Sequence, residues 1–388
     1  MAKQKQFNLL DVATISGARV SKFDGTKQYV ATADLDINKI VGGEQVTYDD
    51  RPSRADLIMR RDDILFAKMK KTLKVLAGSP EVEKKIFSTG FYILTPKKNI
   101  NKKYLYFFLI GSDFNYQKDL YSSGATMAAI GNEGLKRIKI YLPVDSKGNP
   151  DIKEQERIVA LLEEAEGLKN KRAEADQKMV TVIPALFSKM FGNPLSNPMN
   201  WEIKKLGNLC SIRRGASPRP IAKYIGGTVP WIKIGDGTNG DEMYITDTSV
   251  KVTEEGAKKS VYLKAGSMVF ANCGVSLGFA RILKINGCIH DGWLSFENIN
   301  DSLNEIYLLK FINKITPHLR LIASDGTQPN LTTTIMKNFP IPIPPIKLQN
   351  EFAERVNEIF DFGEKQKGST VSINTLFSSL LSRTFVNN

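Results

Sequence analysis

The chain is poor in the residues on which metal and redox chemistry depend. Its 388 residues include 3 cysteines and 2 histidines, and no two cysteines form a Cys-x-x-Cys pair. This scarcity argues against a disulfide framework, a zinc ribbon and a histidine-based metal site. We predict a chain without metal or cofactor in a reducing, cytoplasmic setting.

Long apolar runs are also missing. No stretch of about 20 apolar residues occurs, which is the length that a membrane-spanning helix needs. The N-terminal residues MAKQKQFNLLDVATIS lack the apolar core of a signal peptide. We therefore expect no contact with a membrane.

The common catalytic motifs are absent from the sequence. There is no glycine-rich phosphate loop ending in Lys-Ser or Lys-Thr, and no Asn/Asp-Pro-Pro-aromatic motif of amino methyltransferases. Cys273 and His290 lie in the same half of the chain, but a nucleophile pair needs more support than co-occurrence. We predict no catalytic residues, with an enzyme of unrecognised site as an alternative.

Positive charge is abundant. Lysine and arginine number 54 against 41 acidic residues, which gives a net charge of +13 and a pI near 9.4. Residues 204–223 hold six basic residues and no acidic one, and Lys68, Lys70, Lys71 and Lys74 form a second cluster. This pattern favours an anionic polymer as partner, although a generic basic protein would share the overall charge.

A long helix is predicted after a short apolar strand that ends near Pro143. Asp151 suits the N-cap and Glu154 follows three residues later, as in an acidic capping box. Alternating spacings of three and four indicate a coiled-coil stripe or an ordinary amphipathic helix. Pro184 predicts a kink or the start of another helix. The stripe consists of Ile158, Leu161, Ala165, Leu168, Ala175, Met179, Val182 and Leu186.

A second strand and helix follow the same order between residues 336 and 385. Gly363 and Gly368 lie in the middle of this helix and predict a bend or break, because glycine costs about 1 kcal/mol in a helix interior. Each stripe needs a partner, and we predict that the two helices pair with each other. The second stripe consists of Phe352, Val356, Ile359, Ile373, Phe377 and Leu380.

The two halves of the chain repeat each other. Phe66 and Phe270 differ by 204 positions (270 − 66), and Gly90 and Gly292 by 202 (292 − 90). We predict an α/β (α+β) fold with a pseudo-twofold internal repeat, in which two mixed domains alternate with two long helices that pair as an antiparallel coiled coil. The predicted boundaries are 1–145 and 198–345 for the domains and 146–197 and 346–388 for the helices.

Two basic domains on a helical spacer suggest that the chain reads duplex DNA at two places. Candidate reading loops are 213–220 and 326–330 in the second domain, with 68–74 and 122–126 at the matching positions of the first. Solvated basic turns and helix caps are the alternatives for these loops. The predicted DNA-binding residues are Lys68, Lys70, Lys71, Lys74, Thr126, Arg213, Arg214, Ser217, Arg219, Asn272, Thr327, Gln328 and Asn330.

The order of motifs resembles the specificity (S) subunit of a type I restriction-modification system. Each junction is similar to the Gly-Thr turn, Ile-Pro-Leu-Pro-Pro-like strand end and Glu-Gln helix start of that family. The matching segments are Gly326-Thr327, residues 340–345 and Leu348-Gln349, with Gly124-Ala125-Thr126, Leu142-Pro143 and Glu154-Gln155 in the first half. Trp201-Glu202 resembles the usual domain opening, whereas the first domain lacks this tryptophan and carries an insert, Val144 to Pro150.

The resemblance implies a non-catalytic subunit whose two target-recognition domains each read one half of a bipartite DNA site. The helices would set the gap and dock two methyltransferase (M) subunits, which carry S-adenosylmethionine and modify adenine. Restriction (R) subunits would cut the DNA. Rival hypotheses are a stand-alone DNA-binding regulator, a coiled-coil scaffold without nucleic acid, and a specificity subunit of another restriction class. The bases that are read cannot be deduced, because such loops vary on one fold.

Overall fold

The computed structural model describes residues 3–125, 127–238, 243–274, 276–323 and 330–385. The chain divides into two compact units, which we call unit 1 (residues 1–174 and 367–388) and unit 2 (residues 175–366). These units divide each of the two long helices, whereas the domain boundaries predicted from the sequence lie near the ends of the helices.

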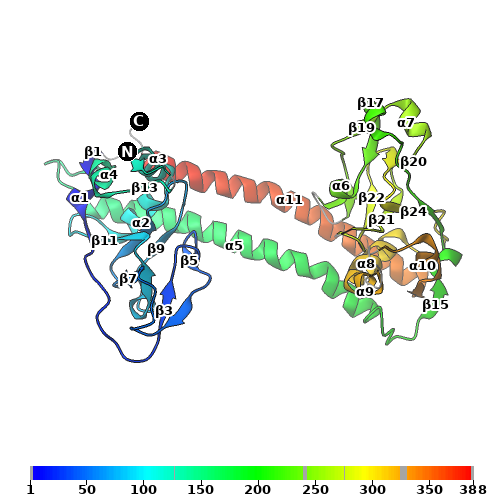
Figure 1. Cartoon of the computed structure of the whole chain (residues 1–388), viewed down its shortest axis with the longest axis horizontal. Helices are drawn as coiled ribbons and strands as arrows, with labels where there is room; N and C mark the ends of the chain where they lie inside the picture. Colours follow the sequence, from blue (N-terminus) through cyan, green and yellow to red (C-terminus); the bar gives the residue numbers. More distant parts are fainter. Residues whose placement is uncertain (1–2, 126, 239–242, 275, 324–329, 386–388) are drawn as a thin grey trace. The chain divides into compact units, whose positions relative to one another are not determined.

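Unit 1 combines short strands with small helices (Figure 1). In chain order its elements are β1 (Gln4–Asn8), α1 (Leu9–Val12), β2 (Ala13–Ile15), β3 (Lys27–Val30), β4 (Leu35–Asp36), β5 (Lys39–Ile40), β6 (Glu44–Val46), β7 (Ala55–Leu57), β8 (Ile64–Ala67), β9 (Val75–Ala77), the 3-10 turn η1 (Val82–Lys84), β10 (Ile86–Ser88), β11 (Phe91–Pro96), α2 (Lys102–Ile110), α3 (Ser112–Leu120), β12 (Ser122–Ser123), β13 (Ala129–Ile130), α4 (Asn132–Arg137) and β14 (Lys139–Pro143).

Unit 2 follows a similar order (Figure 1). Its elements are β15 (Glu202–Lys205), η2 (Leu206–Asn208), β16 (Ser211–Arg214), η3 (Ile221–Lys223), β17 (Ile225–Ile232), α6 (Ile234–Thr238), β18 (Tyr244–Ile245), β19 (Lys251–Val252), α7 (Glu254–Lys258), β20 (Val261–Leu263), β21 (Met268–Ala271), β22 (Ala280–Leu283), β23 (Gly287–Ile289), β24 (Trp293–Glu297), α8 (Glu305–Lys314), α9 (Thr316–Ala323), α10 (Thr333–Asn338) and β25 (Pro340–Ile343).

The sheets of the two units repeat each other. The order β2-β11-β8-β9 in unit 1 corresponds to β16-β24-β21-β22 in unit 2, where β18 adds one more strand. A second sheet contains one parallel pair in each unit, with Tyr29 opposite Ile86 and Trp231 opposite Cys288. Both partners of this pair are shifted by 202 positions (231 − 29 and 288 − 86). The predicted α/β fold with an internal repeat is therefore confirmed.

A strand pair at the end of each domain leads into a long helix. In unit 1 β1 lies antiparallel to β14, and in unit 2 β15 lies antiparallel to β25. The tyrosine hydroxyls of α2 and α8 donate to carbonyls of these strands, Tyr104 to Tyr141 O at 2.9 Å and Tyr307 to Pro342 O at 2.8 Å. The same bond at equivalent positions fixes each helix against its sheet.

A buried glutamine at the start of each long helix makes a second repeated connection. Gln155 and Gln349 are both fully buried, and each side-chain oxygen accepts a hydrogen bond at 2.8 Å. The donors are the backbone amides of Asn101 and Asn304, whose side chains cap α2 and α8. The Glu-Gln helix start noted in the sequence therefore ties the long helix to the capped helix of its domain.

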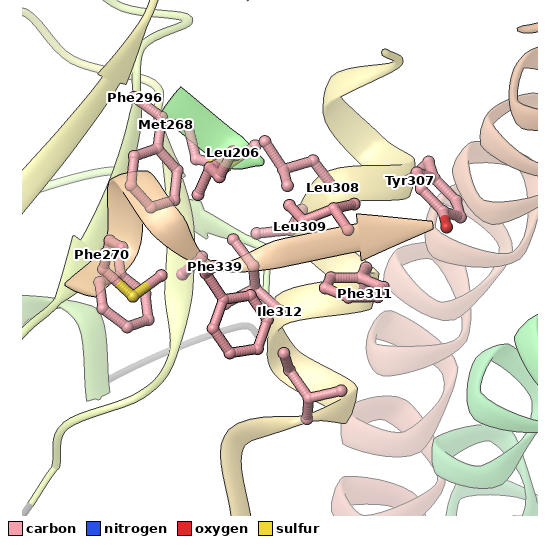
Figure 2. Close-up of a cluster of buried hydrophobic side chains, with 14 of the residues drawn as sticks. Leu206, Met268, Phe270, Phe296, Tyr307, Leu308, Leu309, Phe311, Ile312 and Phe339 are labelled. Carbon is pink, nitrogen blue, oxygen red and sulfur yellow. The ribbon is translucent and has the colours of Figure 1, made fainter. Parts of the chain in front are cut away.

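The core of unit 2 lies between the sheet and helix α8. Figure 2 shows Met268, Phe270 and Phe296 of the strands next to the side chains of α8. On its other side Tyr307 stacks on Phe187, with ring centroids 5.7 Å apart and an interplanar angle of 12°. Burial of such rings is the main contribution to the stability of a domain of this size.

The long helices are α5 (Ile152–Phe191) and α11 (Ile346–Phe385), of 40 residues each. In unit 1 the first part of α5 shares a core with the last part of α11. In unit 2 the last part of α5 shares a core with the first part of α11. This is the order that an antiparallel pair requires. In the part of the chain that the structure describes, neither of these helices nor any other is apolar over a length that could span a membrane.

The expected interruptions of these helices do not occur. Pro184 lies inside α5 and begins no separate helix, and α11 continues without a break through Gly363 and Gly368. The cost of two glycines is small beside the packing of Phe352 on one side and Phe377 on the other. The predicted N-cap is confirmed, because Asp151 Oδ1 accepts from the Glu154 amide at 3.1 Å.

The apolar stripe predicted for α11 fits the structure better than the one predicted for α5. Phe352, Val356 and Phe377 are buried as expected. Near the start of α5 the buried apolar residues are Val159, Leu162 and Ala165, of which only Ala165 belongs to the predicted stripe, whereas Leu161 and Leu168 are each 49% exposed. The start of α5 packs on a globular core, so the contacts with the domain decide which face is buried, rather than a heptad alone.

Candidate nucleic-acid interface

The predicted loop 213–220 of unit 2 begins later than the sequence suggested. Arg213 and Arg214 lie in strand β16 and pair with Ser295 and Leu294 of β24. The loop starts at Gly215, where an added Cβ would lie 2.2 Å from the carbonyl oxygen of His290. The assignment of both arginines to a loop is therefore wrong, because the strand ladder fixes their backbone.

Both arginines also have partners within the unit. The Arg213 guanidinium donates from Nε and Nη2 to the two carboxylate oxygens of Glu297, each at 3.0 Å. Arg214 Nε donates to Asp291 O at 2.8 Å. The guanidinium of Arg213, a predicted DNA-binding residue, is thus occupied by a carboxylate, although its side chain is 57% exposed.

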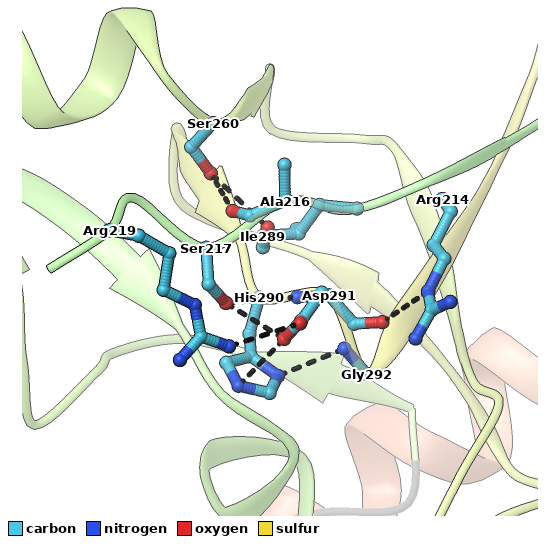
Figure 3. Close-up of polar contacts among 9 residues, drawn as sticks. All are labelled: Arg214, Ala216, Ser217, Arg219, Ser260, Ile289, His290, Asp291 and Gly292. Carbon is cyan, nitrogen blue, oxygen red and sulfur yellow. Dashed lines mark hydrogen bonds and ion pairs between the residues drawn. The ribbon is translucent and has the colours of Figure 1, made fainter. Parts of the chain in front are cut away.

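Asp291 organises the loop that follows (Figure 3). Its carboxylate accepts from Ser217 Oγ at 2.7 Å and lies 3.6 Å from Arg219 Nη2. His290 Nε2 lies 2.9 Å from the same carboxylate, while His290 Nδ1 accepts from the Gly292 amide at 2.9 Å. Because Nδ1 is an acceptor, the neutral ring carries its proton on Nε2 and donates it to Asp291.

The electrostatics of this cluster keep Asp291 charged and His290 neutral. Burial raises the pKa of Asp291, but the Ser217 hydrogen bond and the charges of Arg219 and Arg214 outweigh it, so the pKa falls below its ordinary value. Burial lowers the pKa of His290 below its ordinary value of 6.5, and Asp291 opposes this effect. No sequence pattern pointed to Asp291, and His290 was considered only as a partner for a nucleophile.

Asn272 does not lie on the surface. It is 1% exposed, and its Nδ2 donates to Asn330 Oδ1 at 3.1 Å. Its prediction as a direct DNA contact is therefore corrected: it holds the partly exposed Asn330 in place. Thr327 and Gln328, predicted beside Asn330, lie outside the residues that the structure describes.

The lysine cluster of unit 1 lies in the hairpin loop between β8 and β9. Lys68 Nζ donates to Thr89 O at 2.9 Å and lies 4.2 Å from the ring centre of Tyr92. Burial, followed by the nearby charge of Arg19, lowers the pKa of Lys68. Lys74 Nζ donates to Thr32 O at 2.6 Å, whereas Lys70 and Lys71 are exposed. Two of the four predicted lysines therefore point at carbonyls and two face solvent.

An open hollow of about 580 Å³ lies beside Lys68. Cations and aromatic rings at one surface can hold phosphates and stacked bases. The sequence analysis found Lys68 and the neighbouring segment 122–126, of which Thr126 lies outside the described residues. It missed the aromatic and amide members, because they come from strands and turns that carry no local motif. The lining includes Arg19, Lys68, Tyr92, Tyr121, Ser123 and Asn132.

Comparison with known proteins gives the family. The model of the type I restriction modification DNA specificity domain matches residues 1–175 and 198–372. Since the matches cover most of the chain in two repeats, this protein belongs to that family, whose members are DNA-binding, target-recognising proteins of type I restriction-modification systems.

Relatives agree with this assignment. The type I restriction enzyme MjaIX specificity subunit of Methanocaldococcus jannaschii is 24% identical over 192 residues, which are 49% of this chain and 44% of that protein. The chain thus matches less than half the length of that relative. A sequence named as the MjaX specificity subunit of the same organism is 22% identical over 362 residues, 86% of this chain and 79% of the other.

A solved structure shares the fold. A chain from a study of the complex assembly and conformational transition of the type I R-M system has a TM-score of 0.69 to this one. The two are 19% identical, and the likeness covers 98% of this chain and 97% of the other. At this identity the comparison establishes a common architecture.

Proposed function

We propose that this chain is the DNA-reading subunit of a type I restriction-modification complex and that it reads a bipartite site. The observation that carries the proposal is that each of the two copies of one domain bears a basic, partly exposed surface, around residues 68–74 in unit 1 and around residues 213–219 in unit 2. Residues 1–145 would form the first recognition domain and residues 198–345 the second. Each would read one half-site in double-stranded DNA.

The long helices would separate the half-sites and dock the other subunits. Leu161 and Leu168 on α5 and Phe362, Val371 and Leu376 on α11 are 49–65% exposed, so both helices present apolar side chains to solvent. Where such side chains form a contiguous patch, they mark a protein interface. Two methyltransferase subunits carrying S-adenosylmethionine would bind there, and restriction subunits would join them, while this chain supplies no catalytic group.

The experiment that tests the proposal is long-read sequencing of DNA from cells that express this chain with its neighbouring methyltransferase. We expect adenine methylation in a split motif, with two short specific halves around a fixed gap. An active, expressed methyltransferase that leaves no split motif would favour the regulator or scaffold hypothesis instead.

A second experiment tests whether the long helices set the gap between the two half-sites. Insertion of four residues after Leu168 adds roughly 6 Å of helix at 1.5 Å per residue. Since base pairs are about 3.4 Å apart along duplex DNA, the preferred gap should change by about one or two base pairs. A motif with unchanged spacing would contradict the proposal that the helices set the gap.

A further inference from the structure

A buried lysine holds the basic hairpin loop of unit 1 from behind. Lys118 on α3 is 1% exposed, and its Nζ donates to Thr72 O and, at 3.2 Å, to Met69 O. The adjacent Asp119 accepts from the amide of Lys71 at 2.9 Å. Lys71 has a φ of 57°, a left-handed conformation that a non-glycine residue adopts at a cost. One turn of α3 thus fixes the loop that displays Lys70 and Lys71.

Unit 2 repeats this arrangement with an arginine. Arg320 on α9 donates from Nε to Leu277 O at 3.0 Å, in the hairpin loop between β21 and β22. Thr316 Oγ1, one turn earlier, donates to Gly278 O at 2.6 Å. Arg320 follows Lys118 by 202 positions (320 − 118), the same interval that separates the parallel strand pairs of the two units. A cation therefore occupies the equivalent place in both copies of the domain, but Arg320 is exposed whereas Lys118 is buried.

Burial makes the position of Lys118 costly for a charged group. Desolvation lowers its pKa, and the nearby charge of Asp119 opposes this effect. The Asp119 carboxylate is hydrogen-bonded to the loop amide, while the Lys118 ammonium donates to loop carbonyls. A leucine or methionine could fill the same volume without this cost, so what the cation adds is directed hydrogen bonds to the loop backbone.

We infer that Lys118 is a positioning residue that fixes the hairpin loop between β8 and β9, which carries Lys70 and Lys71, the candidate DNA contacts of its domain. Lys118 is too buried to touch DNA, so it acts through the loop. The inference rests on the proposed function, because it assigns a positioning cation to one half-site. It also predicts that arginine can replace lysine in this role, because Arg320 donates to a loop carbonyl from the corresponding place in unit 2.

The test uses the complex with its methyltransferase and three duplexes: the mapped split motif and two versions with one half scrambled. For Lys118→Met we expect discrimination against one scrambled half to fall about tenfold, the value of roughly one base contact, with the other half unchanged. Lys118→Arg should retain discrimination at both halves. Lys147→Met, an exposed lysine in the turn between β14 and α5, is the charge-matched control.

The salt dependence of DNA binding distinguishes a positioning residue from a residue that contacts a phosphate. Lys118→Met should leave the slope of log Kd against log salt unchanged, whereas Lys70→Met should reduce the slope by about 0.9. If Lys118→Met lowers the melting temperature of the protein, Asp119→Ala offers a milder change to the same loop and should affect the same half. Equal loss at both halves, or no loss in either variant, would overturn the inference and leave the split motif intact. Failure to find a split motif with the wild-type chain would instead overturn the proposed function.

Discussion

The two units hold their cations in different ways on the same scaffold. In unit 1, Lys68 and Lys74 donate to backbone carbonyls, which orient the ammonium groups without cancelling their charge. In unit 2, Arg213 and Arg219 face the carboxylates of Glu297 and Asp291. The first surface therefore presents net positive charge, while the second presents arginines that are already paired with acids.

This difference bears on how each surface would meet DNA. The Arg213–Glu297 pair is solvent-exposed, and such pairs contribute about 0–1 kcal/mol, so a phosphate or a base edge could replace the carboxylate at little cost. In the absence of DNA, the Glu297 carboxylate keeps the Arg213 guanidinium in one orientation. The comparison indicates that the basic surfaces of two copies of one domain can favour attraction in one copy and orientation in the other.

The largest effect is expected from reversing the uncompensated charge of unit 1. Lys70→Glu with Lys71→Glu should weaken binding of the mapped duplex by about 100-fold at moderate salt, because two phosphate contacts become repulsive. The loss should shrink as the salt concentration rises. The matched control is Lys147→Glu with Lys153→Glu, two exposed lysines of the same unit. Equal losses in both double variants would show that total charge, rather than the loop, governs binding.

Replacing Arg214 and Arg219 by glutamate tests the effect of charge reversal on DNA binding by unit 2. We expect a smaller loss than in unit 1, because part of their charge is already balanced by Asp291. The loss should fall on one half-site, as shown with the half-scrambled duplexes. A larger loss than that of Lys70→Glu with Lys71→Glu would contradict the contrast between the units.

A stability comparison addresses the buried glutamines. Gln349 donates to Ser302 O at 3.0 Å and Pro344 O at 2.7 Å, whereas Gln155 donates to Asn99 O at 3.4 Å. Gln349→Met should therefore destabilise its unit more than Gln155→Met, each by about 1–3 kcal/mol for buried groups left without partners. Chemical unfolding with a fluorescence readout checks the order. A larger loss for Gln155→Met would show that the longer bond is the more important one.

The sequence predicted the repeated architecture well, because turn residues and strand ends keep their spacing along the chain. It placed the buried residues of α11, but on α5 it named Ala165 and missed Val159 and Leu162, which pack on a domain that no local pattern reveals. It found the basic residues of the candidate interface by composition. It could not find Asp291, Tyr92 or Lys118, because their roles depend on contacts between segments far apart in sequence.

A smaller effect on DNA affinity is expected when the Glu297 carboxylate that balances the Arg213 charge is neutralised. Glu297→Gln keeps a hydrogen-bond acceptor but removes the carboxylate charge, so affinity for DNA of unrelated sequence should rise several-fold at low salt. The slope of log Kd against log salt should steepen by up to about 0.9. Glu133→Gln, in an exposed pair of unit 1, is the control. An unchanged slope in Glu297→Gln would place Arg213 away from phosphates.

The smallest effect concerns pH. The pKa of His290 is lowered in the folded chain, so between its folded pKa and 6.5 the unfolded chain binds more protons. The free energy of unfolding of unit 2 should therefore be highest above pH 6.5 and should fall as the pH drops through the folded pKa. Asp291 remains charged in this interval, because its pKa lies below 3.8. Urea midpoints at pH 7.5 and 5.5 should differ less for His290→Gln than for the wild-type chain. An identical pH dependence in both chains would mean that His290 is as easily protonated in the folded protein as in the unfolded one.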